Sequence, residues 1–311
     1  MTAAAPAALT TEQIGFLARA VSRAPSVHNS QPWQLRVRGT EVDLTVGHGV
    51  ELRRQDPFGR DRLLSCGAAL TDLELAVRAL GRDCHVEYRD EEDVVATVTI
   101  GRPRPASTRD FALYHAITRR RSHRRAFFHS RVPEGVRTAV AAAGEATGVH
   151  VVEPGRLGKL AELLGFATRV LRDDRGYQRE LELWTAHTHG WNAVGDGVPE
   201  DAPDEVVLAG RLAAENLLVV CTDTDTRPDH LAAGAALQRI WLTATAKALV
   251  GSVITQPLHL TGFRARLASE LALPGVPQAI FRYGYPAVPA APSPRLPLGE
   301  LVPDGPAGGR R

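Results

Sequence analysis

Two segments of this chain open with the same four residues, and this repeat restricts the fold more than any other feature. Gly67-Ala68-Ala69-Leu70 opens one long helical pattern, and Gly234-Ala235-Ala236-Leu237 opens another. Each pattern ends with Ala-Leu and a nearby glycine, at Gly81 and Gly251. Ala-rich helices share short motifs by chance, so the repeat alone is weak. It gains weight because each half also shows a helix followed by a strand near its start, as two related halves would.

The composition is that of an ordinary globular protein. The 311 residues are 44% hydrophobic and 23% charged, which suits one large domain or two intertwined halves. A net charge of +2 indicates neither a strongly basic nucleic-acid surface nor a basic membrane surface. No apolar run reaches the length of about 18 residues that spans a membrane, and we identify no signal peptide. Cys66, Cys84 and Cys221 share no metal-type spacing. We therefore expect a cytoplasmic protein without disulfides.

The patterning predicts an α+β fold. Segments with helical spacing of apolar residues alternate with short segments typical of strands. Thr10 and Gln13 form the pattern of a capping box at the start of the first helix. The expected helices cover about 10–24, 64–80, 108–118, 133–146, 157–172, 177–184 and 232–250, and the expected strands cover 34–38, 41–46, 85–89, 94–100, 149–153, 217–222 and 278–285.

A short basic segment, Arg120-Arg121-Ser122-His123-Arg124, stands above this background. In an extended stretch, Arg120, Ser122 and Arg124 would project to one side and offer two guanidinium groups and a hydroxyl. Such donors suit a phosphate dianion, because charge-assisted hydrogen bonds from arginine are strong. The alternative is a solvated basic turn between two helices, and the segment taken alone favours that alternative.

A second segment, residues 24–33, is a polar loop that ends in Trp33. Pro25 and Pro32 fix φ and stiffen the loop, which lowers the ordering cost of binding a ligand. The amides of Asn29 and Gln31, together with backbone groups, can recognise the carbonyl and amide groups along one edge of a flavin ring. The alternative is a well-capped surface loop after a helix.

Together the two segments resemble the nitroreductase family of FMN proteins. That family has an Arg-x-Ser-x-Arg/Lys stretch and a Pro-Ser-x-x-Asn-x-Gln-Pro-Trp loop, which match residues 120–124 and 25–33 here. Residues 282–298 resemble its last strand and phosphate-binding arginine, and residues 251–257 resemble its loop along the flavin ring. The resemblance covers roughly residues 10–300. It implies FMN as the cofactor, held by Pro25, Ser26, Val27, Asn29, Gln31, Arg120, Ser122, Arg124, Ser252, Val253 and Arg295.

The order of the two motifs departs from the family pattern. Ordinary members carry the arginine segment ahead of the loop in one subunit, whereas here the loop comes first and the arginine segment lies in the second half. The second half has no Pro-Ser-Asn loop, because its helix runs through residues 143–148 straight into a strand. In family dimers both subunits hold each FMN. A fused pair with one motif in each half would therefore hold one FMN. This arrangement resembles the Acg-type branch, whose members are linked to dormancy and stress responses.

The resemblance implies a nitroreductase-like fold with central mixed sheets flanked by helices and an internal pseudo-dimer. The first half would span residues 10–104 and the second half residues 105–302, with a disordered tail at 303–311. We expect a monomer or a homodimer that binds neither nucleic acid nor membrane.

The family branch also has a lid over the flavin, and the long, polar, Gly-rich segment 184–203 is the candidate for it. His189, Trp191, Asn192 and Asp196 could face the ring, and an exposed loop is the alternative. His187 and His189 have no nearby carboxylate, so we expect no metal site. His28, inside the flavin loop, is expected to be positioned by packing and not to act as a general base.

The leading functional hypothesis is an FMN-dependent oxidoreductase. It would use NAD(P)H to reduce FMN and then a nitroaromatic, a quinone or a similar acceptor. The flavin would supply the chemistry, so no catalytic acid or base is expected. The sequence has no Gly-x-Gly-x-x-Gly after a strand and therefore no Rossmann site for the nicotinamide. In the family that this chain resembles, the nicotinamide stacks transiently on the flavin and needs no dinucleotide fold. The alternative is an FMN-sequestering or storage protein with little reductase activity. A flavin-destroying oxidase of the same fold has no distinct residue support.

Overall fold

The computed structural model describes residues 8–47, 52–89, 93–186 and 205–303, and its strands form two separate four-stranded sheets. The strand order is β1-β2-β4-β3 in the first sheet and β5-β6-β8-β7 in the second, so both sheets repeat one order along the chain. This is the arrangement that two related halves predict. The strands are β1 (Trp33–Arg38), β2 (Glu41–Val46), β3 (Arg82–Tyr88), β4 (Val94–Pro103), β5 (Val149–Val152), β6 (Asn216–Thr222), β7 (Val250–Ile254) and β8 (Val276–Gly284).

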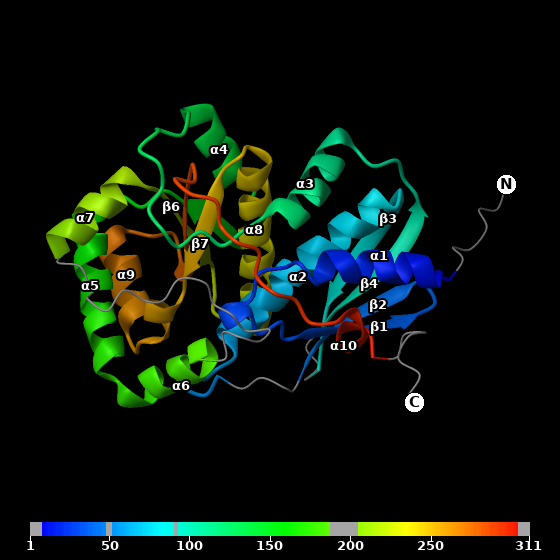
Figure 1. Ribbon diagram of the computed structural model, residues 1–311, viewed down its shortest axis with the longest axis horizontal. Coiled ribbons are helices and arrows are strands. Elements are labelled where there is room, and N and C mark those ends of the chain that lie inside the picture. The colour runs from blue at the N-terminus through cyan, green and yellow to red at the C-terminus, as the bar shows by residue number, and fades with distance from the viewer. Residues whose placement is uncertain (1–7, 48–51, 90–92, 187–204, 304–311) are drawn as a thin grey trace.

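Helices separate and cover the two sheets, which confirms the α+β class. Figure 1 shows α2 and α8 between the halves and α5, α7 and α9 beyond the second sheet. Among the described residues, no helix is long and apolar enough to cross a membrane. The helices are α1 (Thr11–Val21), α2 (Arg60–Ala79), α3 (Thr108–Arg119), α4 (Glu134–Ala142), α5 (Leu157–Asp173), α6 (Arg175–Ala186), α7 (Glu205–Ala214), α8 (Arg227–Ala246), α9 (Phe263–Leu271) and α10 (Leu298–Leu301), with short 3₁₀ helices η1 (Val27–Asn29) and η2 (Gln256–His259).

The expected capping box at the start of α1 is confirmed. The Thr10 hydroxyl oxygen accepts from the Gln13 backbone N–H at 3.3 Å, and the Gln13 side-chain oxygen accepts from the Thr10 backbone N–H at 3.0 Å. The helix then buries Leu17 and Val21 against the first core. Because α1 ends just before the loop at 25–31, the cap and these two side chains fix where that loop begins.

Gly67 and Gly234, the first residues of the repeated motif, lie where α2 and α8 pack closely against each other. A Cβ atom on Gly67 would lie 2.1 Å from the Leu231 carbonyl oxygen, and one on Gly234 would lie 2.0 Å from the Leu64 carbonyl oxygen. Each glycine thus faces the carbonyl of the residue three positions before the other glycine. The reciprocal contact means that the repeated sequence marks the helix pair that joins the two halves.

Each sheet has its own core. In β6, Leu218 and Val220 pack on the α8 side of the second sheet, while Leu217 and Val219 pack on the α5 and α9 side. A strand buried on both faces reads as a continuous apolar run, which explains the pattern at residues 217–222. The first core also receives side chains from α8, so the two halves share apolar contacts.

Parts of the structure differ from the expectations. Residues 251–257 were expected to be a loop, but Val250–Ile254 form edge strand β7, paired with β8, before η2. Helices α7 and α9 were not expected. The strand pairs of both sheets are antiparallel, and a single residue bridge between Ser122 and Gly251 adds a parallel contact. Residues 187–203 of the expected lid and 304–311 of the expected tail lie outside the described residues.

After β8 the chain returns to the first half, as the red trace in Figure 1 shows. Helix α10 packs against α1 and β1, and Leu301 and Val302 join the first core. The Gln34 side chain donates to the Glu300 carbonyl oxygen at 3.2 Å. The end of the proposed second half therefore packs on the first half, and this return carries residues 292–296 past the loop at 25–31.

Candidate functional site

Three segments that are distant in sequence meet at the backbone of Arg23. The guanidinium of Arg120 donates to the Arg23 carbonyl oxygen at 3.2 Å, and the guanidinium of Arg295 donates to the same oxygen at 2.9 Å. The arginine segment, the return segment and the start of the loop at 25–31 therefore converge at one place. This is the juxtaposition that the split motifs predicted.

The amide side chains of the loop hold the return segment. Asn29 accepts from Arg295 Nη1 at 3.0 Å through Oδ1 and donates from Nδ2 to the Pro294 carbonyl oxygen at 2.9 Å. The Gln31 side-chain oxygen accepts from the Leu296 backbone N–H at 3.0 Å. Both amides were expected to recognise the edge of a ring. In the structure they bind residues 294–296 and thereby fix the position of Arg295.

The loop has an unusual backbone. His28, Asn29 and Gln31 have φ values of 46°, 57° and 48°, in the left-handed region that non-glycine residues rarely adopt. Each such residue costs on the order of 1–3 kcal/mol and persists where the surroundings impose it, which is common at binding sites. Here the Ser26 hydroxyl accepts from the Gln31 N–H at 3.0 Å. Val27 donates from its backbone to the Ser65 hydroxyl of α2 at 3.1 Å.

A small pocket lies at the convergence, and its lining is strongly basic. It is lined by Arg23, Ile117, Arg120, Arg121, Ser122, Pro292, Ser293 and Arg295. Burial, and after it the neighbouring Arg295, lowers the pKa of Arg120 to about 9. Burial and the nearby Arg23 lower the pKa of Arg295 to about 10. Both guanidinium groups stay charged at neutral pH, so the pocket concentrates positive charge where an anion would relieve it.

Arg120 also has unused donors. It is 4% exposed, and its Nε and Nη1 have no hydrogen-bond partner among the described residues. The guanidinium stacks over the Trp241 ring at 4.5 Å from the ring centre. A buried donor without a partner costs free energy, and a bound phosphate oxygen would satisfy it. The donor set therefore fits the phosphate group that the sequence suggested.

A buried carboxyl group stands behind this pocket. Asp72 of α2 is fully buried, and its Oδ1 accepts from the Gln238 side chain of α8 at 2.7 Å. Burial raises the pKa of Asp72 to about 7, although Gln238, Arg120 and Arg295 oppose this shift. Oδ2 has no partner among the described residues. Near neutral pH this group therefore gives the two arginines only a partial counter-charge.

The other end of the arginine segment runs beside β7. Ser122 forms a bridge with Gly251, and the His123 backbone N–H donates to the Gly251 carbonyl oxygen at 2.8 Å. This pairing places Ser122 next to Ser252, which is buried. The Arg124 carbonyl oxygen accepts from Arg282 of β8 at 3.1 Å. Val253 follows in the same strand, half-buried. The expected contact residues at 122–124 and 252–253 thus lie along one edge.

A second polar network joins α2 to η2. Asp61 accepts from Arg60 at 2.9 Å and lies 3.1 Å from the His259 ring nitrogen. Although burial opposes it, Arg60 and His259 hold the pKa of Asp61 well below its usual range. Ligand atoms of Asp56, Asp61 and His259 lie within 4.8 Å of one another. The carboxylate oxygens already accept hydrogen bonds from protein groups. We therefore interpret the cluster as a hydrogen-bonded connection between α2 and η2.

Burial of His28 lowers its pKa, although Asp61 and Gln55 oppose the shift. Its imidazole is therefore neutral at pH 7, and Nε2 has no hydrogen-bond partner among the described residues. The lid candidates His187, His189, Trp191, Asn192 and Asp196 lie outside those residues.

Arg23 and Asp72 were not among the residues predicted from the sequence. Arg23 lines the pocket, and its carbonyl oxygen accepts hydrogen bonds from both guanidinium groups. In the sequence, however, an arginine near the end of a surface helix looks like an ordinary solvated residue. Asp72 carries a usable signal, because it is an acidic residue inside an apolar helical pattern. A charge at such a position is rarely buried without a partner.

Comparison with known proteins identifies full-length relatives. No family model matches the chain. A Mycobacterium tuberculosis protein named "Putative NAD(P)H nitroreductase Rv3131" is 33% identical over 95% of this chain and 93% of its own length. Another, "Putative NAD(P)H nitroreductase acg" from the same organism, is 27% identical over 94% and 96%. Among solved structures, the FMN-dependent nitroreductase NfnB from Mycobacterium smegmatis in complex with NADPH has 21% identity and a TM-score of 0.45, covering 62% of this chain and 97% of its own.

The first of these relatives shares about a third of its residues with this chain along almost the whole length of both. The chain therefore belongs to the nitroreductase family, in its Acg-type branch.

Proposed function

We propose that the chain binds one FMN and works as an NAD(P)H-dependent oxidoreductase that reduces a small acceptor such as a nitroaromatic or a quinone. The observation that carries this proposal is the shared contact of Arg120 and Arg295 with the Arg23 carbonyl, which gathers several guanidinium groups around one small pocket. Family membership supports the cofactor and the nicotinamide donor, because the relative that shares a third of its residues is named an NAD(P)H nitroreductase.

The proposed binding residues divide by position. Arg120, Ser122, Arg124 and Arg295 would hold the phosphate, since the first, second and fourth line the basic pocket. The ring would lie between the loop at 25–31, which supplies Pro25, Ser26 and Val27, and β7, which supplies Ser252 and Val253. Asn29 and Gln31, which hold Arg295 and the return segment, would lie beside the edge of the ring. FMN, when bound, supplies the hydride chemistry; the residues of the chain bind and orient it.

Further assignments follow from the family branch. We propose that residues 10–104 and 105–302 are the two nitroreductase-like halves and that residues 184–203 form a lid over the ring. A cytoplasmic location and a role in a stress response complete the proposal.

The experiment that tests the function is anaerobic addition of NADPH or NADH to the purified, FMN-loaded protein. Bleaching of the flavin absorption band, followed by recovery of the band when a quinone or a nitroaromatic is added, is expected for the enzyme. A band that persists with both nicotinamides would favour an FMN-sequestering protein instead. A protein that does not retain FMN at all would contradict both the oxidoreductase and the FMN-sequestering function.

A further inference from the structure

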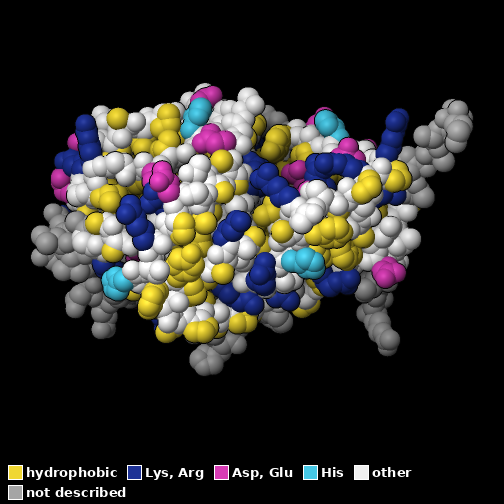
Figure 2. Space-filling view, turned by 90° about the horizontal axis from the view of Figure 1, so that it is seen from above, with side chains coloured by type: hydrophobic (Ala, Val, Ile, Leu, Met, Phe, Trp, Pro, Cys, Tyr) yellow, Lys and Arg dark blue, Asp and Glu magenta, His cyan; other side chains and the backbone are white. Residues whose placement is uncertain are grey.

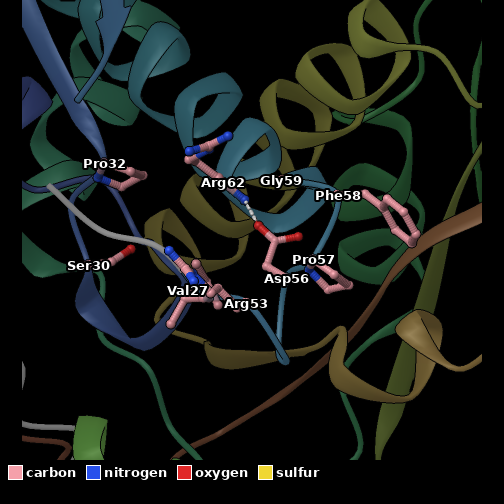
Figure 3. Close-up of a pocket in the computed structure, with 10 residues that line it drawn as sticks. Val27, Ser30, Pro32, Arg53, Asp56, Pro57, Phe58, Gly59 and Arg62 are labelled. Atoms are coloured by element: carbon pink, nitrogen blue, oxygen red, sulfur yellow. Dashed lines mark hydrogen bonds between the residues drawn. The ribbon is translucent and has the colours of Figure 1, made fainter. Parts of the chain in front are cut away.

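A second cavity adjoins the loop at 25–31, at the N-terminal end of α2. Its volume is about 300 Å³, at the lower end of the range for small-molecule sites. Figure 3 shows Val27, Ser30 and Pro32 on one side, Asp56 and Arg62 between, and Phe58 on the far side. The cavity shares none of its lining residues with the basic pocket at Arg120. It is therefore a separate concavity that adjoins the same loop.

The wall of this cavity contains polar atoms without protein partners. Ser30 is 4% exposed, and its hydroxyl oxygen has no hydrogen-bond partner among the described residues. Nε of Arg62 is also buried and has no hydrogen-bond partner among these residues. Buried polar groups are almost always satisfied by protein, water or ligand. Ser30 and Arg62 come from different segments and face one cavity, which indicates a ligand with hydrogen-bonding oxygen atoms.

The guanidinium of Arg62 lies close to the backbone of Gly59. Gly59 has φ of +70°, and a Cβ atom there would lie 2.9 Å from Nη2 of Arg62 and 3.4 Å from its Nε. Only glycine combines this φ with that space. The side chain of Arg62 therefore lies over Gly59 at the start of α2.

Among the described residues that line the cavity, basic side chains outnumber acidic ones. Arg53 and Arg62 line it with one carboxylate, Asp56. The Asp56 oxygens accept the backbone N–H groups of Asp61 at 3.0 Å and of Arg62 at 2.8 Å, so this carboxylate caps the helix. Burial, and after it the charge of Asp61, raises the pKa of Asp56. The cavity lining therefore carries two guanidinium groups and one carboxylate, which suits an anionic ligand.

An exposed aromatic ring completes the lining. Phe58 is 88% exposed, the largest exposure among the large hydrophobic side chains that the structure describes. Such a ring can stack on a planar base, and arginine forks can hold a phosphate monoester beside it. A hydroxyl, two guanidinium groups and a phenyl ring around about 300 Å³ match a base that carries a phosphate.

We propose that this cavity binds the adenosine 2′-phosphate end of NADPH and makes the protein prefer NADPH to NADH. The inference rests on the proposed nicotinamide-dependent function and adds a specificity site to it. Arg53 and Arg62 bind the 2′-phosphate, Ser30 donates to a phosphate or ribose oxygen, and the adenine stacks on Phe58. Val27, shared with the proposed FMN site, places the cavity beside the flavin loop.

The test is calorimetric titration of the purified full-length protein with 2′,5′-ADP, 5′-AMP and inorganic phosphate. We expect 2′,5′-ADP to bind at least about 10-fold more tightly than 5′-AMP, since the 2′-phosphate adds charge-assisted hydrogen bonds. Arg62→Ala should weaken 2′,5′-ADP about 10-fold or more, for the same reason. Phe58→Ala should weaken both nucleotides about 5-fold or more through lost stacking, and its exposure leaves folding unaffected. The matched control is Arg109→Ala on α3, which removes the same charge from an exposed side chain that lines neither pocket.

The outcomes separate this inference from the proposed function. Equal affinity for 2′,5′-ADP and 5′-AMP would overturn it, and so would unchanged 2′,5′-ADP affinity in Arg62→Ala and Phe58→Ala. Phosphate that competes as tightly as 2′,5′-ADP would show a simple anion site and would also overturn it. If FMN binds and is reduced equally by both nicotinamides, only this inference fails. If 2′,5′-ADP binds as expected but no FMN is retained, the nucleotide site stands and the flavoenzyme proposal fails.

Discussion

The guanidinium of Arg295 donates to the amide oxygen of Asn29 at 3.0 Å, although 266 residues separate the two in sequence. Arg295 also donates to the Ala24 carbonyl oxygen at 3.0 Å. These bonds tie the returning C-terminal segment to the strained loop of the first half. Arg295 thus has two roles in the proposed site, because it contributes positive charge to the pocket and fixes the loop beside it.

We predict that Arg295→Ala weakens FMN binding. The substitution removes a charge-assisted hydrogen bond to the phosphate, worth roughly 1.5–3 kcal/mol, or about 10- to 150-fold in affinity. Fluorescence titration of FMN into the flavin-free protein measures the change. Because Arg295 also holds the loop, its substitution could disturb the fold, and Arg124→Ala serves as a second variant. The side chain of Arg124 is exposed, so we expect its removal to leave folding unchanged. FMN affinity that is unchanged in both variants, as it should be in the Arg109→Ala control, would refute the phosphate assignment.

The arginines and the loop could be predicted from sequence because each motif is a short stretch of distinctive residues. The contacts of Asn29 and Gln31 could not, since their partner at residues 294–296 is set by the path of the chain after β8. The segment from Gly251 to Pro257 was predicted as a loop because it resembles the loop along the flavin ring in the nitroreductase family. The β-branched residues between them pair with β8, and a Cβ atom on Gly251 would lie 2.4 Å from the Phe281 ring. That glycine therefore reflects close packing and not a turn.

A second prediction concerns Asp72 and pH. The pKa of this carboxyl is about 7 in the folded protein, against an ordinary value of 3.8, chiefly because it is buried. Between these values the folded state keeps a proton that the unfolded state has released. The free energy of unfolding should therefore fall as pH rises from 4 to 7, by at most about 1.4 kcal/mol per pH unit, and level off above pH 7.

Asp72→Asn should remove this slope, because an amide can still accept from Gln238 but does not ionise. Urea unfolding of the flavin-free protein at several pH values measures it, and the variant should be more stable than the parent above pH 7. Asp173→Asn, at an exposed position, is the matched control and should keep the slope of the parent. An identical pH profile for the parent and Asp72→Asn would show that Asp72 does not carry this effect.

A third prediction concerns the joint between the halves. Gly67→Ala places a Cβ atom 2.1 Å from the Leu231 carbonyl oxygen, so α2 and α8 must move apart. We expect a loss of about 1–3 kcal/mol or more in the free energy of unfolding, as for other overpacked cores. Gly158→Ala in α5 is the control, since nothing lies within 4 Å of its Cβ position. It should instead stabilise by up to about 1 kcal/mol through helix propensity. Equal thermal stability of the two variants would contradict the close approach of the helices.

The internal repeat could be recognised in the sequence only where α2 packs against α8. The strand order repeats fully, but the insertions between strands differ. Helices α5, α6 and α7 connect β5 to β6, where the first half has only the turn at Gly39 and Thr40 between β1 and β2. Insertions of this size hide an internal repeat, because they break the spacing that a repeat search relies on.

The last prediction is one FMN per chain. The basic pocket uses Arg120 and Arg295 from the second half and the backbone of Arg23 from the first. By the matching strand order, α4 corresponds to α1 because each precedes the first strand of its sheet. The segment after α4, residues 143–148, contains no Pro-Ser-x-x-Asn loop, so the related position lacks the residues that the proposed site needs.

Absorbance of the flavin released by denaturation, divided by protein concentration, measures this ratio. We expect a value of one for the full chain, with no requirement for a second chain if the protein is monomeric in solution. Arg295→Ala should lower the ratio at limiting FMN, and the Arg109→Ala control should leave it at one. Two tightly bound flavins per chain would mean that the second half supplies its own loop-like contacts, and the division of one site between two halves would then be wrong.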